Sequence, residues 1–86
     1  MLKYEKFPPI SKFEYVLKHL PETALLYARF YHDADSDNAL VVDKKETRNL
    51  YQCSITVFRN QCFSLRDGGF IELSENAKYF YIDLNV

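Results

Sequence analysis

The sequence contains few residues that break or cross-link a chain: of its 86 residues, two are glycine, three are proline, two are cysteine and none is tryptophan. So few glycines and prolines exclude a collagen-like or low-complexity chain. Two cysteines cannot form a disulfide framework, so we expect two reduced thiols and a cytoplasmic protein. No apolar run approaches the roughly 18 residues of a membrane span, and the N-terminus lacks the features of a secretory signal.

What the sequence does contain is apolar and aromatic side chains. Hydrophobic residues make up 48% of the chain, and seven phenylalanines and seven tyrosines bring the aromatic fraction to 16%. This composition excludes intrinsic disorder. A chain of this length has room for one compact core, so residues 1–86 are interpreted as a single domain.

The formal net charge of −1 conceals an uneven distribution of charge. Residues 44–66 hold five basic side chains and one acidic side chain, a local net charge of +4. The remaining 63 residues hold six basic and eleven acidic side chains, a net charge of −5. Because salt screens charges beyond about 8 Å, the basic segment can attract a polyanion although the whole chain is nearly neutral.

The first half of the chain predicts an arm, two helices and a short strand. Residues 1–9 are interpreted as an N-terminal arm, and Ser11 is the predicted N-cap of the first helix. Apolar side chains at helical spacing predict that this helix buries Ile10, Phe13, Val16, Leu17 and Leu20. A second helix is expected from about Glu22 to His32, and the apolar run Ala39–Val42 is expected to be a strand.

The second half predicts two helices joined by a tight turn, followed by a β-hairpin. Asp43 is the expected cap of a helix over 44–51, and Ser54 is the expected cap of a helix over about 55–67. Period-two alternation after the glycine pair predicts a hairpin over 70–84 with its turn at Ser74–Ala77. The helix after Ser54 should bury one stripe of side chains, namely Ile55, Phe58, Cys62 and Leu65. The predicted fold class is therefore α+β, with about four helices, a short strand and a C-terminal hairpin.

This order resembles a winged helix-turn-helix, with the helix-turn-helix at 43–68 and the wing at 70–84. Ser54–Arg59 is similar to the opening of a recognition helix, and Leu65–Ile71 is similar to the exit into a wing. The wing ending Tyr81–Asn85 is also similar to that of plasmid replication-initiator proteins. The resemblance implies a sequence-specific binder of double-stranded DNA, a homodimer, that regulates transcription or plasmid or phage replication.

A recognition helix must present donors and acceptors to base edges in the major groove. With the predicted stripe buried, the exposed side of the helix carries Thr56, Asn60 and Ser64, flanked by Arg59. Asparagine pairs bidentately with adenine and arginine with guanine, while threonine offers its methyl group to thymine. Phosphate contacts are expected from the helix start, the basic segment and the wing, at Lys44, Lys45, Arg48, Ser54, Arg66 and Lys78.

The same region also supports a second class of function, a winged-helix module that binds a protein. Phe63 falls on the outward side, where it can stack on a thymine methyl group, pack on a partner subunit or be covered by the arm. The wing is acidic at Glu75, with Lys78 as its one nearby base, and Gln52 stands where the family's turn usually has glycine. The side chains that can read bases, Asn60 and Arg59, favour DNA as the partner, whereas Phe63 and Val57 favour a protein partner.

Other chemistry is less well supported by the sequence. Residues 33–38 match the first half of a calcium-binding EF-hand loop, but Lys44 stands where the bidentate glutamate belongs. The two histidines, His19 and His32, and the two cysteines have no zinc-ligand spacing. The chain also has no glycine-rich phosphate loop and no nucleophile motif. We therefore expect no enzymatic activity, no metal and no cofactor.

Overall fold

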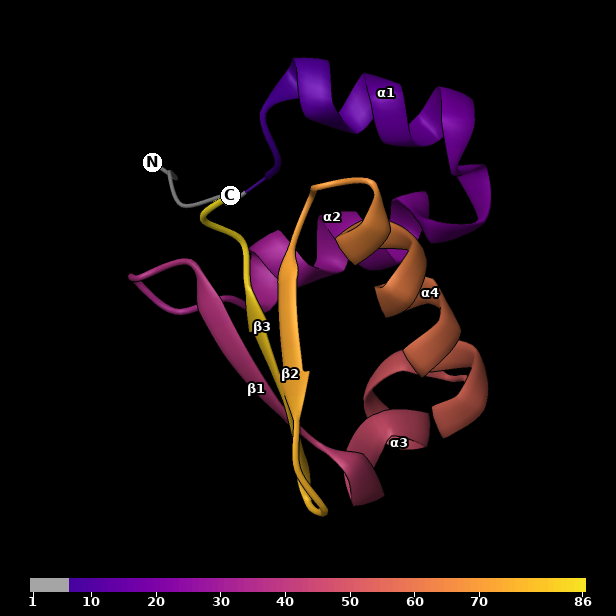
Figure 1. The fold of residues 1–86 in the computed structure, drawn as a ribbon, viewed down its shortest axis with the longest axis vertical. Coiled ribbons are helices and arrows are strands. Elements are labelled where there is room, and N and C mark those ends of the chain that lie inside the picture. Colours follow the sequence, from indigo (N-terminus) through magenta and orange to yellow (C-terminus); the bar gives the residue numbers. More distant parts are fainter. Residues whose placement is uncertain (1–6) are drawn as a thin grey trace.

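Helices and strands are mixed along the chain (Figure 1). The structure, a computed structural model, describes residues 7–86, so most of the predicted arm lies outside the described residues. Two short 3₁₀ turns, η1 (Pro21–Thr23) and η2 (Lys44–Glu46), lead into the second and third helices. The regular elements are α1 (Ile10–His19), α2 (Ala24–Asp33), β1 (Ala39–Asp43), α3 (Thr47–Tyr51), α4 (Ile55–Asp67), β2 (Glu72–Glu75) and β3 (Tyr79–Asp83). The α+β class is thus confirmed for the described part of the chain.

The three strands form one antiparallel sheet in the order β1-β3-β2. β3 lies in the centre, and its Phe80 is in register with Val42 on one side and with Glu75 on the other. The turn between β2 and β3 falls at Asn76–Lys78, later than predicted, because the Asn76 carboxamide oxygen accepts hydrogen bonds from the backbone N–H groups of Lys78 and Tyr79. Glu75 therefore belongs to the strand and shares the inner face of the sheet with Phe80.

The core lies between the inner face of the sheet and the helices α2 and α4. The rings of Phe30, Phe58 and Phe80 are fully buried, and the Phe58 ring centre lies 5.9 Å from that of Phe30 and 5.1 Å from that of Phe80. Full burial of such a side chain stabilises the fold by about 1.5–3 kcal/mol. The predicted stripe of α4 is confirmed at Phe58, Cys62 and Leu65, whereas Ile55 is only half-buried.

The prediction for the first helix is wrong in its start and in part of its buried face. The helix begins at Ile10 with Pro9 in the N-cap position and no side-chain cap, so Ser11 lies inside the first turn. Of the predicted apolar stripe only Val16 is fully buried, while Ile10 and Leu17 are 62% and 52% exposed. The reason is visible in Figure 1, where α1 lies across one end of the molecule and packs against it along a single side.

The other helix ends follow the predicted caps closely. Asp43 accepts a hydrogen bond from the Lys45 N–H at the start of η2, and the helix predicted over 44–51 is this turn followed by α3. α4 ends at Asp67, and Gly69 takes the left-handed conformation, with φ of +84°, that turns the chain into β2. Within residues 7–86 no helix is long and apolar enough to cross a lipid bilayer.

Candidate nucleic-acid interface

α3 and α4 are joined by a tight turn whose geometry rests on two side chains. Gln52 adopts the left-handed conformation, with φ of +55°, at the position where glycine was expected. Its carboxamide Nε2 donates to the Asn49 carbonyl oxygen at 2.8 Å, which offsets part of the cost of that conformation. The Ser54 hydroxyl accepts from the Val57 N–H at 3.2 Å and caps α4, as predicted.

Arg29 on α2 holds this turn from outside the helix pair, a role that the sequence analysis missed. Its guanidinium donates from Nη2 to the Leu50 carbonyl oxygen at 2.5 Å and from Nη1 to Gln52 Oε1 at 3.4 Å. The same group lies 4.7 Å from the centre of the Tyr51 ring. Because Arg29 stands more than 20 residues away along the chain, no local pattern marks it as a partner of the turn.

The outward face of α4 carries the predicted polar side chains. Thr56 and Asn60 are exposed, and Ser64 is half-buried. Phe63 is half-buried as well, with the Arg66 guanidinium carbon 4.6 Å from its ring centre. Arg66 also forms an exposed ion pair with Asp67 at 3.1 Å. The middle of this face therefore presents an amide and a hydroxyl to solvent, and the Arg66 guanidinium stacks on the Phe63 ring.

Glu75 at the end of β2 binds two of the predicted DNA-contacting cations. Arg59 on α4 donates from Nε and Nη2 to the two carboxylate oxygens, at 3.2 and 3.0 Å. Lys44 on η2 donates to Oε1 of the same carboxylate at 2.6 Å. Both cations also lie over the Phe80 ring, 5.0 Å for Lys44 and 5.4 Å for Arg59 from its centre. We call this group the Glu75 cluster.

The Glu75 cluster changes the electrostatics of the interface. Its hydrogen bonds from Arg59 and then Lys44 lower the pKa of Glu75 to about 2, so the carboxylate is charged at neutral pH. The hydrogen bonds that Arg59 donates to Glu75 raise the pKa of Arg59. The Nε–Nη2 edge of Arg59, a fork suited to a guanine or a phosphate, is occupied by the carboxylate. The sequence pattern placed Glu75 in the turn of the hairpin. Continuing the alternation of Ile71 and Leu73 by one more step would have placed it on the inner face, where the strand register puts it.

The remaining predicted phosphate contacts lie beside this cluster. Lys45, Arg48 and Lys78 are exposed, and none of the ion pairs among residues 7–86 includes them. The Lys44 N–H donates to the Lys78 carbonyl oxygen at 2.9 Å, which holds the turn of the hairpin against η2. A hollow of about 190 Å³ lies at this junction, lined by Asp43, Lys44, Lys45, Ala77, Lys78 and Tyr79. The structure thus brings Lys78 next to Lys44 and Lys45, which lie more than 30 residues earlier in the sequence.

Two of the residues considered for other chemistry, Asp35 and Cys62, have structural roles. Asp35 Oδ1 accepts from the N–H groups of Asp37 and Ala39 and shapes the acidic loop before β1. No group of three or more His, Cys, Asp and Glu side chains within residues 7–86 is arranged to hold a metal ion. Burial raises the pKa of the Cys62 thiol to about 12, so at neutral pH it is not the thiolate that a nucleophile requires.

Comparisons with protein-family models, with curated proteins and with solved structures found no significant match to this chain. The case for a function therefore rests on the geometry of the residues themselves. That geometry consists of an exposed polar face on α4, a hairpin joined to α4 and η2 by the Glu75 cluster, and three exposed cations, Lys45, Arg48 and Lys78, that no ion pair among residues 7–86 includes.

Proposed function

We propose that the chain is a winged helix that binds double-stranded DNA sequence-specifically and regulates transcription or plasmid or phage replication. Two helices joined by a tight turn and followed directly by a hairpin support this proposal, because that is the order of elements in the winged helix-turn-helix. The proposed role is binding without catalysis. The proposed location of the protein is the cytoplasm, where both free thiols, Cys53 and Cys62, stay reduced.

The observation that carries the proposal is the outward face of α4. Thr56 and Asn60 are exposed there, and the Asn60 carboxamide has no hydrogen-bond partner among the described residues. An exposed amide of this kind can pair bidentately with adenine when the helix enters the major groove. Lys45 and Arg48 lie on the helical segment before α4 and would neutralise phosphates on the flanking backbone. Lys78 would extend the phosphate contacts to the wing.

The Glu75 cluster refines the roles of Lys44 and Arg59. In this arrangement Arg59 joins the wing to α4 and Lys44 joins it to η2, and either side chain can turn to DNA only by releasing Glu75. We therefore propose that Asn60 and Thr56 make the main contacts with base edges, and that Ser64 and Arg59 make secondary ones. Ser54 and Arg66 remain proposed phosphate contacts at the two ends of α4.

A homodimer on a two-fold operator is part of the proposal. α1 supports it, because Ile10 and Leu17, which lie about two helical turns apart on one face, expose 62% and 52% of their surface. Burying this line of side chains against a second copy would remove it from water, and the symmetry of a dimer would set two copies of α4 about 34 Å apart on one face of the DNA.

A specific observation favours a second candidate, a module that binds a protein through the same helices. Val57 on α4 and Leu50 on α3 are 44% and 43% exposed and lie beside the polar face. Phe63, the residue first considered for this role, is stacked under Arg66 and contributes less exposed surface than expected.

The experiment that tests the proposal begins with a library of randomised duplexes, because the operator is unknown. Selection should enrich one sequence, and a gel-shift titration should then show tighter binding to it than to a scrambled duplex. The logarithm of the affinity should fall linearly with the logarithm of salt concentration, with a slope that reports the phosphates contacted. Failure to enrich any sequence, with salt-independent binding, would reject DNA as the partner.

A further inference from the structure

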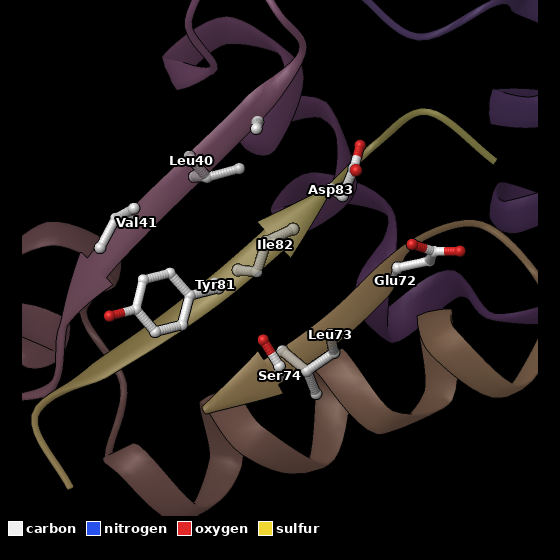
Figure 2. A pocket seen from close by; sticks show the side chains of 9 residues that line it. Leu40, Val41, Glu72, Leu73, Ser74, Tyr81, Ile82 and Asp83 are labelled. Atoms are coloured by element: carbon white, nitrogen blue, oxygen red, sulfur yellow. The ribbon is translucent and has the colours of Figure 1, made fainter. Parts of the chain in front are cut away.

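The outer face of the sheet, turned away from α2 and α4, carries a hollow of about 380 Å³ (Figure 2). The figure shows side chains of all three strands rising from this face, with Tyr81 of the central strand between Val41 and Ser74. The register agrees, because Val41 and Ser74 are the two cross-strand partners of Tyr81. We call the region around these three residues, with Glu72 and Asp83, the outer sheet face.

The charge of the outer sheet face is entirely negative. The three strands contain four carboxylates and no lysine, arginine or histidine. Asp43 caps a helical turn and Glu75 forms ion pairs. Glu72 and Asp83 lie directly opposite each other across β2 and β3, where like charges destabilise a sheet. Asp83 Oδ1 also accepts a hydrogen bond from the Asn85 N–H at 2.9 Å, which leaves its charge in place. No ion pair among residues 7–86 neutralises Glu72 or Asp83.

An exposed apolar patch lies next to this pair of acids. Val41 is 59% exposed and Tyr81 is 40% exposed, although they are cross-strand partners at the middle positions of β1 and β3. They are two residues along the strands from the row that holds Asp83 and Glu72, a distance of about 6.6 Å on one face. The face therefore offers an apolar site and an anionic site. The distance between the two sites matches the distance between alternate residues of an extended chain.

We propose that the outer sheet face docks an extended basic segment of a partner protein. An aliphatic side chain of the segment would lie on Val41 and Tyr81, and an arginine or lysine two residues away would pair with Glu72 and Asp83. The charge excludes nucleic acid from this face. A second copy of this chain fits less well, since Lys45, Arg48 and Lys78, which no ion pair among residues 7–86 includes, lie on helical turns or a bend and not on an extended segment.

This inference goes beyond the DNA-binding proposal and does not depend on it, because the outer sheet face is on the side of the sheet opposite to α4. A regulator with both surfaces would bind DNA through its helices and a basic partner through its sheet at the same time. A variant that loses peptide binding but keeps DNA binding, or the reverse, would distinguish a failure of this proposal from a failure of the DNA-binding proposal.

The test uses a fluorescein-labelled peptide, Ser-Leu-Thr-Arg-Ser-Leu-Thr, and the same peptide with glutamate in place of arginine. Fluorescence anisotropy at low salt should show binding of the arginine peptide only. The double variant Glu72→Gln/Asp83→Asn should bind it at least about fivefold more weakly, and so should Val41→Ser. Glu14→Gln, which removes an exposed carboxylate from α1, is the matched control and should bind as the wild type does.

Three results would overturn the proposal. The first is equal binding of the arginine and glutamate peptides. The second is unchanged binding by the double variant, measured on protein that keeps the wild-type circular dichroism. The third is a concentration-dependent oligomer in sedimentation velocity that the double variant abolishes, because the face would then be filled by a second copy of this chain.

Discussion

Arg59 on α4 and Glu75 on β2 are joined by two hydrogen bonds, from Nε to Oε2 at 3.2 Å and from Nη2 to Oε1 at 3.0 Å. The pair fixes the hairpin against the helix proposed to read DNA, and Lys44 binds the same carboxylate from the other side. A charged residue proposed for DNA contact thus has an internal partner already. A DNA phosphate would have to compete with Glu75 for it.

Replacing Glu75 with glutamine should destabilise the fold at neutral pH by about 0.5–1 kcal/mol, the range for ion pairs that water partly screens. The folded pKa of Glu75 is about 2, below its ordinary value of 4.5. The contribution is therefore complete above pH 4.5 and is lost as the pH falls towards 2. Urea denaturation of the wild type and the variant from pH 2 to 7 would show the two curves converge at the acidic end. A constant difference across that range would contradict the assigned ion pairs.

The same substitution should tighten DNA binding. Glu75→Gln removes the carboxylate that competes with phosphate for Lys44 and Arg59, so up to two further cations become available. The salt dependence of binding should steepen by about 0.9 for each added phosphate contact. Gel-shift titration at several salt concentrations measures both effects, with Glu14→Gln as control. Weaker binding of Glu75→Gln would mean that the fastened wing is needed for recognition.

Asn60→Ala and Lys45→Ala should weaken DNA binding in different ways. Loss of the Asn60 amide should cost about 1–3 kcal/mol on the selected duplex and relax the preference at one base pair. Loss of Lys45 should weaken binding to selected and scrambled duplexes alike and reduce the salt slope by about 1. Lys18→Ala on α1 is the matched control for charge. If Asn60→Ala binds both duplexes as the wild type does, the assignment of this side chain is wrong.

Leu65→Ala should lower the free energy of unfolding by about 2–5 kcal/mol, because Leu65 is fully buried in the stripe of α4. Leu25→Ala removes the same atoms from a side chain that is 75% exposed and should change stability by less than about 0.5 kcal/mol. Denaturant unfolding of both variants measures the contrast. Similar midpoints for the two would show that the register of α4 is not the one described.

Arg29→Ala should destabilise the protein by about 1.5–3 kcal/mol, the usual range for a hydrogen bond to a charged group. The substitution leaves the Leu50 carbonyl and the Gln52 side chain without their cationic partner at the turn. Hydrogen exchange should increase locally at residues 50–54 in the variant. A loss of stability without that local change would place the effect in α2 instead of the turn.

Much of the candidate site follows from local sequence. The Ser54 cap, the buried stripe of α4 and the strand Ala39–Val42 all depend on neighbours within a few residues, so cap chemistry and periodicity were enough to predict them. The hairpin followed from its alternation, although the turn was placed too early because Asn76 was not recognised as the residue that closes it.

The amphipathic pattern of α1 predicted less well which of its side chains are buried. Helical spacing shows which side chains share a face, but the depth of their burial depends on how much of the fold reaches that face. α1 packs along one side at the end of the molecule, so Val16 is buried while Ile10 and Leu17 remain in water.

By itself, the sequence determined the elements, their order and the polar side of α4, because these depend on local hydrogen bonding and periodicity. The tertiary structure decided which charges meet. Glu75 reaches Lys44 and Arg59, and Arg29 reaches Leu50 and Gln52, only once strand register and helix packing bring distant segments together. Coulombic pairing acts over a few ångströms in space, and separation along the chain carries no information about such distances.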